Sequence, residues 1–129
     1  MTKAKAVAKR KPIPARGERA KKKILDAAEA LFAKKGFYGV TIREITRKAG
    51  VDTAMANYYF GPKRALFDAV MMRRAEDLNA ARLARLEAVE REAGEGPPVL
   101  ERVIDAFTHP LLDRSALGGA GWKSYFVLI

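Results

Sequence analysis

Apolar residues in the first third of the chain recur every three or four positions, which is the spacing of one helix face. Between residues 16 and 35 this apolar face consists of Ile24, Leu25, Ala28, Leu31 and Phe32. Two lysines and then Gly36 follow, and this is a common way for a helix to end. The pattern therefore predicts a first amphipathic helix that begins near residues 16–19 and ends at Lys35.

Two shorter helices are predicted in the next segment, VTIREITRKAGV, and in the residues that follow it. Thr41 and Glu44 have the spacing of a capping box, which marks a helix start. Gly50 ends this helix within three turns, and Asp52 is a good N-cap for another one. Short helices joined by Gly50, Val51 and Asp52 form a helix-turn-helix pattern, in which the second helix can enter a major groove. The same spacing occurs in ordinary helical bundles, so this pattern alone leaves DNA binding open.

The second helix of this pair has an unusual outward face. A helical wheel directs Val51, Ala56 and Phe60 toward a three-helix core and puts Ala54, Asn57 and Tyr58 on the opposite side, with Met55 beside them. Solvated faces are normally rich in Glu and Lys. This face instead carries small, amide and aromatic groups, which suit base edges and thymine methyl groups. Its composition favours contact with DNA.

The Gly61-Pro62 step ends this helix and starts the next, with Pro62 expected at the first helical position. Lys63 follows in the first turn, where free backbone N–H groups also favour an anion. Tyr59, at the edge of the preceding helix, can present its hydroxyl to a phosphate. We therefore expect Tyr59 and Lys63 to contact a DNA backbone.

The second half of the chain also has helical periodicity. Residues 62–93 read as one long helix whose broad apolar side consists of Leu66, Phe67, Val70, Met71, Leu78, Leu86 and Val89. The stretch AGEGPP breaks it, and Pro98 opens a further helix that His109-Pro110 interrupts or kinks. The loop SALGGAG and the apolar stretch WKSYFVLI follow. These patterns predict an all-α fold class.

Composition supports that fold class and excludes several kinds of site. Hydrophobic residues make up 49% of the 129 positions, enough for an ordinary core, and no apolar run approaches the roughly 18 residues of a membrane span. The chain has no cysteine, so it has neither a disulfide framework nor a thiolate metal site. It also lacks metal-ligand spacings, a Gly-rich phosphate loop and a secretory signal. We expect no metal, no cofactor and a cytoplasmic location.

The net charge of +10 is concentrated near the N-terminus. Residues 1–23 contain ten of the 25 Lys and Arg but only one of the 15 Asp and Glu, which gives this segment +9. Its first part has two prolines and few large apolar side chains, so residues 1–17 are predicted to be a disordered basic arm. Such an arm is attracted by phosphate backbones and by anionic lipid surfaces, and it can also serve solubility alone.

An enzyme is one alternative, but no catalytic residue is predicted. The sole histidine, His109, precedes Pro110 in an otherwise apolar helix, and a lone histidine is more often a satisfied structural residue than a general base. The carboxylates of the second half lie among arginines, as solvated ion pairs do. A non-specific architectural protein, or one that binds anionic surfaces through its basic arm, is the second alternative.

The stretch VTIREITRKAGVDTAMANYYFGPKRALF resembles the DNA-binding domain of the TetR family of bacterial transcriptional repressors. The similarity includes the T-I-R-x-I capping helix, the G-V turn, a short recognition helix that ends in an aromatic residue and Phe, and the lysine that begins helix four, and it covers about residues 18–70. The chain departs from the family where Ala56-Asn57 replaces the commoner Leu-Tyr pair and where Tyr59 replaces a frequent His. The resemblance implies that Arg43, Thr53, Ala54, Met55, Asn57 and Tyr58 face bases. It implies that Thr41, Tyr59 and Lys63 hold phosphates.

The resemblance also implies a domain organisation and a mode of action. Residues 18–64 would be the helix-turn-helix domain, and residues 65–129 a partial helical regulatory domain that lacks its C-terminal part and leaves its apolar end uncovered. The family binds a palindromic operator in double-stranded DNA as a homodimer, in the bacterial cytoplasm and on the nucleoid. A small hydrophobic effector, whose identity the sequence does not specify, would bind among the regulatory helices and move the helix that begins at Pro62, so that the repressor leaves its operator.

Overall fold

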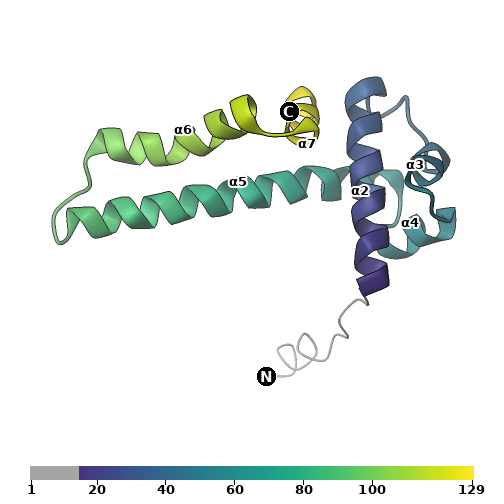
Figure 1. The fold of residues 1–129 in the computed structure, drawn as a ribbon, viewed down its shortest axis with the longest axis horizontal. Coiled ribbons are helices and arrows are strands. Elements are labelled where there is room, and N and C mark those ends of the chain that lie inside the picture. The colour runs from purple at the N-terminus through teal and green to yellow at the C-terminus, as the bar shows by residue number, and fades with distance from the viewer. Residues whose placement is uncertain (1–14) are drawn as a thin grey trace, which may run out of the picture.

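The described part of the computed structural model, residues 15–129, consists of helices and their connections. The helices are α2 (Ala15–Lys35), α3 (Ile42–Ala49), α4 (Thr53–Tyr59), α5 (Lys63–Ala93), α6 (Leu100–Leu117) and α7 (Ala120–Leu128). The first three helices and the start of α5 form a head, from which α5 extends away (Figure 1). Helix α6 returns alongside α5, and α7 lies beside α2. The predicted all-α class is confirmed.

The core of the head is made by the residues that the periodicity selects. Its buried members come from α2, the α2–α3 loop, α3, α4 and α5: Ile24, Ala27, Ala28, Phe32, Val40, Ile45, Ala56, Leu66 and Val70. Phe32 packs edge-to-face on Phe67 with ring centroids 5.2 Å apart. Since four helices share this core, the first two turns of α5 belong to the head.

Several predicted boundaries are wrong. Most of the predicted basic arm lies outside the described residues, but its last three residues begin α2, where Gly17 is buried on the same face as Ala20 and Ile24. Pro62 is the N-cap of α5 and not its first helical residue, because its ψ of 166° is extended. Similarly, Pro98 precedes α6, which begins at Leu100.

The C-terminal segment also differs from its prediction. Helix α6 continues through Pro110 to Leu117, so the expected loop is confined to Gly118 and Gly119. A Cβ at Gly118 would clash with the Arg114 carbonyl oxygen, which explains a glycine at this break. The apolar end is largely covered, because Tyr125 is buried and Leu128 packs against the head core. Of the large apolar residues there, Val127 and Ile129 remain 69% exposed.

A buried carboxylate joins the head to the rest of the chain. Glu29 of α2 has a side chain only 3% exposed, and it accepts hydrogen bonds from two consecutive arginines of α5. Arg73 Nη2 donates at 3.1 Å, while Arg74 Nε and Nη2 donate at 2.9 and 2.8 Å. Arg73 Nη1 also reaches Asp26 at 2.7 Å. We call Asp26, Glu29, Arg73 and Arg74 the junction cluster.

Charge is balanced within the junction cluster. Burial alone would raise the pKa of Asp26, but hydrogen bonds from Lys22 and Arg73 outweigh it and lower that pKa below the ordinary value. The hydrogen bond to Glu29 raises the pKa of Arg74. Both groups therefore stay charged at neutral pH, and the cluster holds α2 against α5 as a set of charge-assisted bonds.

Helix α7 packs directly on this cluster. A Cβ at Gly121 would clash with Arg74 Nη2 and lie 2.9 Å from Glu29 Oε1, so a larger residue here would have to displace the Arg74 guanidinium group. The ring of the next residue, Trp122, contacts two guanidinium groups, with Arg74 Cζ at 5.3 Å and Arg114 Cζ at 5.1 Å from its centroid. The junction therefore brings α2, α5, α6 and α7 together.

The first residue of α5 ties this helix to the α2–α3 loop. Lys63 Nζ donates to the carbonyl oxygens of Phe37 at 2.8 Å and Val40 at 2.9 Å. The same ammonium group lies 4.4 Å from the centroid of the Phe37 ring. Two of its three N–H donors are thus used inside the head, and the lysine acts as a cross-link between segments distant in sequence.

We predict that Glu29→Gln destabilises the chain, because it leaves two partly buried guanidinium groups without their shared charge. The expected loss in the free energy of unfolding is about 3 kcal/mol, the usual scale for breaking a buried ion pair. Asp68→Asn is the matched control, since Asp68 pairs with Arg64 on the surface and both side chains are more than 60% exposed. Urea denaturation of both variants measures the difference, and equal losses would contradict the role of the junction cluster.

We also predict that Lys63→Ala lowers stability in the absence of any DNA. Losing two charge-assisted hydrogen bonds to carbonyls should cost about 2 kcal/mol. Lys48→Ala removes an exposed lysine from the neighbouring helix α3 and should change the free energy of unfolding little. If thermal or urea unfolding shows the two variants to be equally stable, Lys63 does not act as a cross-link.

Candidate nucleic-acid interface

Local caps set the beginning of the helix-turn-helix. Thr41 Oγ1 accepts from the Glu44 N–H at 3.1 Å, and Glu44 Oε1 accepts from the Thr41 N–H at 3.2 Å, so the predicted capping box is present. The hydrogen bond from Lys35 and the N–H of Thr41 lower the pKa of Glu44. Its carboxylate is therefore charged at neutral pH and stabilises the N-terminus of α3.

The turn between α3 and α4 has the predicted chemistry. Gly50 has a φ of 72°, a left-handed conformation that glycine adopts without strain. Its N–H donates to Arg47 O at 3.2 Å and the Val51 N–H donates to Thr46 O at 3.0 Å, which together form a Schellman motif. Asp52 Oδ1 then accepts from the Ala54 N–H at 3.2 Å and caps α4. The direction of α4 relative to α3 is set within these few residues.

A buried hydroxyl that sequence reasoning missed fixes the two helices further. Thr46 is 2% exposed, and its Oγ1 lies 3.1 Å from Thr53 Oγ1 and 3.1 Å from Ile42 O. The burial of Thr46 could have been found in the sequence, because it follows Ile42 by four positions and so lies on the same inward face of α3. A polar group on that face requires a partner. Thr46 therefore positions the N-terminus of α4.

The outward face of α4 is where the helical wheel puts it. Ala54, Asn57 and Tyr58 are exposed, and Tyr58 is 83% exposed, whereas Ala56 is buried. Tyr58 packs edge-to-face on Tyr59 with centroids 5.1 Å apart, which restrains an otherwise free ring. This surface is uncharged and is held by the packing of the opposite side of α4. It can offer an amide, a methyl group and a phenol to a groove.

Of the other three residues expected to face bases, two are half-buried and one is exposed. Thr53 is half-buried with its hydroxyl close to that of Thr46, and Met55 packs against the head core. Arg43 is exposed on α3 and, within residues 15–129, has no carboxylate partner within 4.0 Å. The fold thus brings Ala54, Asn57 and Tyr58 to one surface. The assignment of all six residues to bases stays a prediction.

The three residues expected to hold phosphates are all engaged in internal contacts. Thr41 is exposed, but its hydroxyl already belongs to the capping box. Tyr59 is half-buried and packs against the head core. Lys63 is bonded to two loop carbonyls, which leaves one N–H donor for an outside anion. Their phosphate contacts also stay predictions, and each residue has a structural role besides.

Sequence reasoning did not single out Tyr38 in the α2–α3 loop. Its side chain is 94% exposed, its ring packs edge-to-face on Phe37 at 5.1 Å, and Lys63 Nζ lies 5.9 Å from its centroid. The signal was an aromatic residue between two glycines, Gly36 and Gly39, beside the partly buried Phe37. Tyr38 therefore adds an exposed aromatic ring close to the Lys63 ammonium group.

Other kinds of site find little support in the described part of the chain. His109 is flanked by two carboxylates of its own helix, with Nδ1 3.6 Å from Asp105 Oδ1 and Nε2 3.2 Å from Asp113 Oδ1. Residues 15–129 contain no group of three or more His, Cys, Asp or Glu side chains that could hold a metal ion. Within the same residues, no helix is both long and apolar enough to cross a membrane.

Comparison with known proteins agrees with this geometry. Residues 24–70 match the family model described as bacterial regulatory proteins, tetR family. The HTH-type transcriptional regulator BetI of Escherichia coli O17:K52:H18 (strain UMN026 / ExPEC) is 31% identical over 105 residues, which cover 81% of this chain and 51% of that protein. BetI of Escherichia coli O127:H6 (strain E2348/69 / EPEC) is 28% identical with the same coverage.

The chain thus spans about half the length of the curated relatives it matches. The crystal structure of HlyIIR, a hemolysin II transcriptional regulator, is 22% identical with a TM-score of 0.42, covering 88% of this chain and 87% of that one.

The BetI relatives are transcriptional regulators, which confirms the prediction that the chain is not an enzyme. The match at residues 24–70 falls on the helices that form the head. The chain therefore belongs to the TetR family of bacterial transcriptional regulators.

Proposed function

We propose that this chain is the DNA-reading part of a sequence-specific repressor that a small molecule releases from its operator. The observation that carries the proposal is the outward face of α4, where Ala54, Asn57 and Tyr58 are exposed and uncharged on a rigidly capped helix. An amide can bond adenine edges, and apolar groups suit thymine methyl groups. Arg43, exposed on α3, adds a cation to the same helix-turn-helix. In this proposal α4 enters the major groove.

The partner is double-stranded DNA with a palindromic operator, and the whole protein acts as a homodimer in the bacterial cytoplasm. Support comes from the TetR-family match at residues 24–70 and from the BetI relatives, which are described as HTH-type transcriptional regulators. A single head of this size makes few phosphate contacts. Two heads at a fixed spacing of about one helical turn make the second contact intramolecular and raise affinity.

Release by a ligand is supported by the way α5 is packed. Its first turns share the head core through Leu66 and Val70, while Leu78 and Val89 are buried farther along, where α5 runs beside α6. A ligand between α5 and α6 would shift α5 and with it Lys63 and the junction cluster. Because packed helices move as units, such a shift would change the spacing or tilt of the reading heads.

A non-specific architectural role is a second candidate, favoured by one observation. Residues 1–23 carry +9 of the total charge of +10, and such a segment binds any polyanion. The two candidates differ in the ratio of affinities for a selected operator and for random duplex, which is typically 10³ or more for a specific regulator. Selection from a random duplex library with this chain measures that ratio.

We predict that Arg43→Ala and Tyr58→Ala each weaken binding to the selected duplex by about 1–3 kcal/mol and change the preferred bases, as expected for one good base contact. Arg91→Ala removes an exposed arginine in the last turn of α5 and serves as the matched control. Repeating the selection with each variant reads the base preference directly.

Two outcomes would contradict the proposal. If the selection enriches no sequence, the non-specific architectural role accounts for the protein better. If Arg43→Ala and Tyr58→Ala weaken all duplexes equally and preserve the base preference, these side chains contact the backbone and the assignment of the reading face is wrong.

A further inference from the structure

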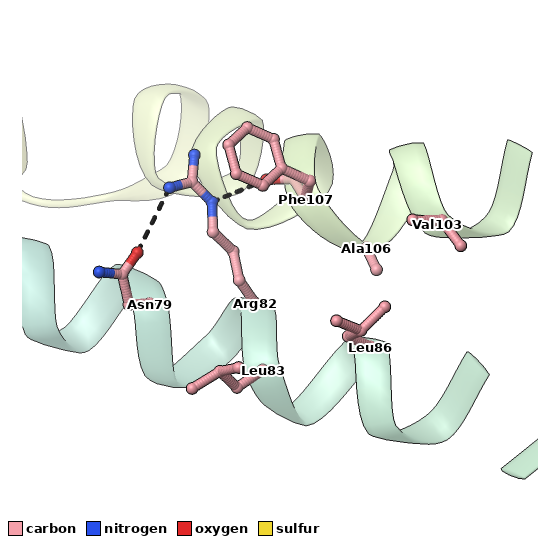
Figure 2. A pocket seen from close by; sticks show the side chains of 7 residues that line it. All are labelled: Asn79, Arg82, Leu83, Leu86, Val103, Ala106 and Phe107. Atoms are coloured by element: carbon pink, nitrogen blue, oxygen red, sulfur yellow. Dashed lines mark hydrogen bonds between the residues drawn. The ribbon is translucent and has the colours of Figure 1, made fainter. Parts of the chain in front are cut away.

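An apolar groove lies between α5 and α6, away from the head. Its volume is about 390 Å³. The apolar side chains that the argument uses are Leu83 and Leu86 of α5 and Val103 and Phe107 of α6, and the polar ones are Asn79 and Arg82 (Figure 2). Leu83 and Phe107 are each 59% exposed, so the groove is open to solvent. This size and lining are typical of sites for small organic molecules.

The only charged group that lines the groove is Arg82, and its contacts are with neutral atoms. Figure 2 shows its side chain rising from α5 toward the Phe107 ring of α6. Arg82 Nε donates to Phe107 O at 2.8 Å, Nη1 lies 3.5 Å from Asn79 Oδ1, and the guanidinium carbon is 3.9 Å from the ring centroid. No carboxylate of residues 15–129 lies within 4.0 Å of this cation.

Other arginines that link α5 and α6 have carboxylate partners. Arg114 reaches Asp77 at 3.1 Å, and Arg102 reaches Glu92 at 2.6 Å. Arg85 lies 3.8 Å from Asp105 and 3.7 Å from Asp113. Arg82 therefore differs from its neighbours, since it holds an uncompensated positive charge at the edge of an apolar groove.

A backbone carbonyl of α6 holds Arg82 in this position. The Phe107 carbonyl oxygen accepts the bond from Arg82 Nε at 2.8 Å. This bond uses one of the five N–H donors of the guanidinium group and aligns the other four, which include the Nη2 donors needed for a bidentate contact.

We propose that this groove binds a small amphipathic anion, with its carboxylate on Arg82 and its apolar body along Leu83, Leu86, Val103 and Phe107. The inference rests on the proposed ligand response and adds the chemical class of the effector. A carboxylate accepts in-plane bonds from Nη1 and Nη2 and replaces the long contact between Nη1 and Asn79. The Asn79 amide N–H group is then free to donate to the same carboxylate. A neutral hydroxyl of similar size can accept only a single bond without charge assistance, and a cationic head group is repelled by Arg82.

Three eight-carbon probes that differ in head group test the proposal on this chain: sodium octanoate, 1-octanol and octylamine. Dissociation constants are measured by NMR titration at pH 7.4 and low salt. We expect the dissociation constant of octanoate to be at least about tenfold lower than those of 1-octanol and octylamine. One charge-assisted hydrogen bond accounts for a difference of this size. Equal constants for octanoate and 1-octanol would overturn the proposal without any variant being needed.

Variants of this chain test whether the preference for octanoate over the other two probes depends on Arg82. Arg82→Gln should remove the preference for octanoate, and Arg82→Lys should keep part of it because the charge remains. Arg91→Gln, an exposed arginine of the same helix, should change nothing. If the preference persists in Arg82→Gln, or if the octanoate constant rises with protein concentration because a second copy covers the groove, the proposal is wrong.

A parallel titration with the selected duplex separates this inference from the proposed function. If octanoate does not bind while the duplex does, the groove assignment fails and the DNA-reading role stands. If octanoate binds through Arg82 but leaves the affinity for the duplex unchanged, the anion site stands and release by ligands at this groove is rejected.

Discussion

The arrangement of this chain depends on one buried carboxylate, Glu29, between Arg73 and Arg74. Taking these charges out of water is costly, so the cluster depends on the three bonds that Glu29 accepts from Arg73 and Arg74. These short bonds restrict the position of α5 relative to α2. Helix α7 adds a steric condition, because Gly121 approaches Arg74 so closely that any side chain would displace it. The angle at which α5 leaves the head is thus closely defined.

Helix α5 belongs to two packing units at once. Leu66 and Val70 are part of the head core, and farther along the helix Arg82 and Arg85 contact α6. Close-packed helices transmit displacement because they cannot deform continuously. A shift of α5 at the α5–α6 groove would therefore affect two of its contacts with the head, those of the junction cluster and those of Lys63. This physical connection is what a ligand-responsive DNA-binding protein requires.

The outward face of α4 shows the opposite property, because its side chains are exposed while its backbone is fixed. Helix α4 has seven residues and would be marginal in isolation. Its stability comes from Asp52, the Schellman turn at Gly50 and the Thr46 hydroxyl, and none of these belongs to the outward face of α4. Substitution of Ala54, Asn57 or Tyr58 should therefore cost the fold little.

The sequence by itself determined the helices of the head and the outward face of α4. The signals were the capping box, the left-handed glycine and the N-cap aspartate, and each acts between residues at most five positions apart, so a local pattern is sufficient. Amphipathic spacing likewise selected Phe32, Ile45 and Ala56 for the core, because one face of each helix has to be buried.

Only the tertiary structure decided which polar groups meet across the chain. Lys63 looked like a phosphate ligand in the sequence, but its bonds go to carbonyls 23 and 26 residues away. Arg82 reaches a carbonyl 25 residues away, at a turn of α6 that Pro110 was expected to break. Glu29 finds its arginines 44 and 45 residues on. These partners follow from the angle between packed helices, which no local spacing of residues specifies.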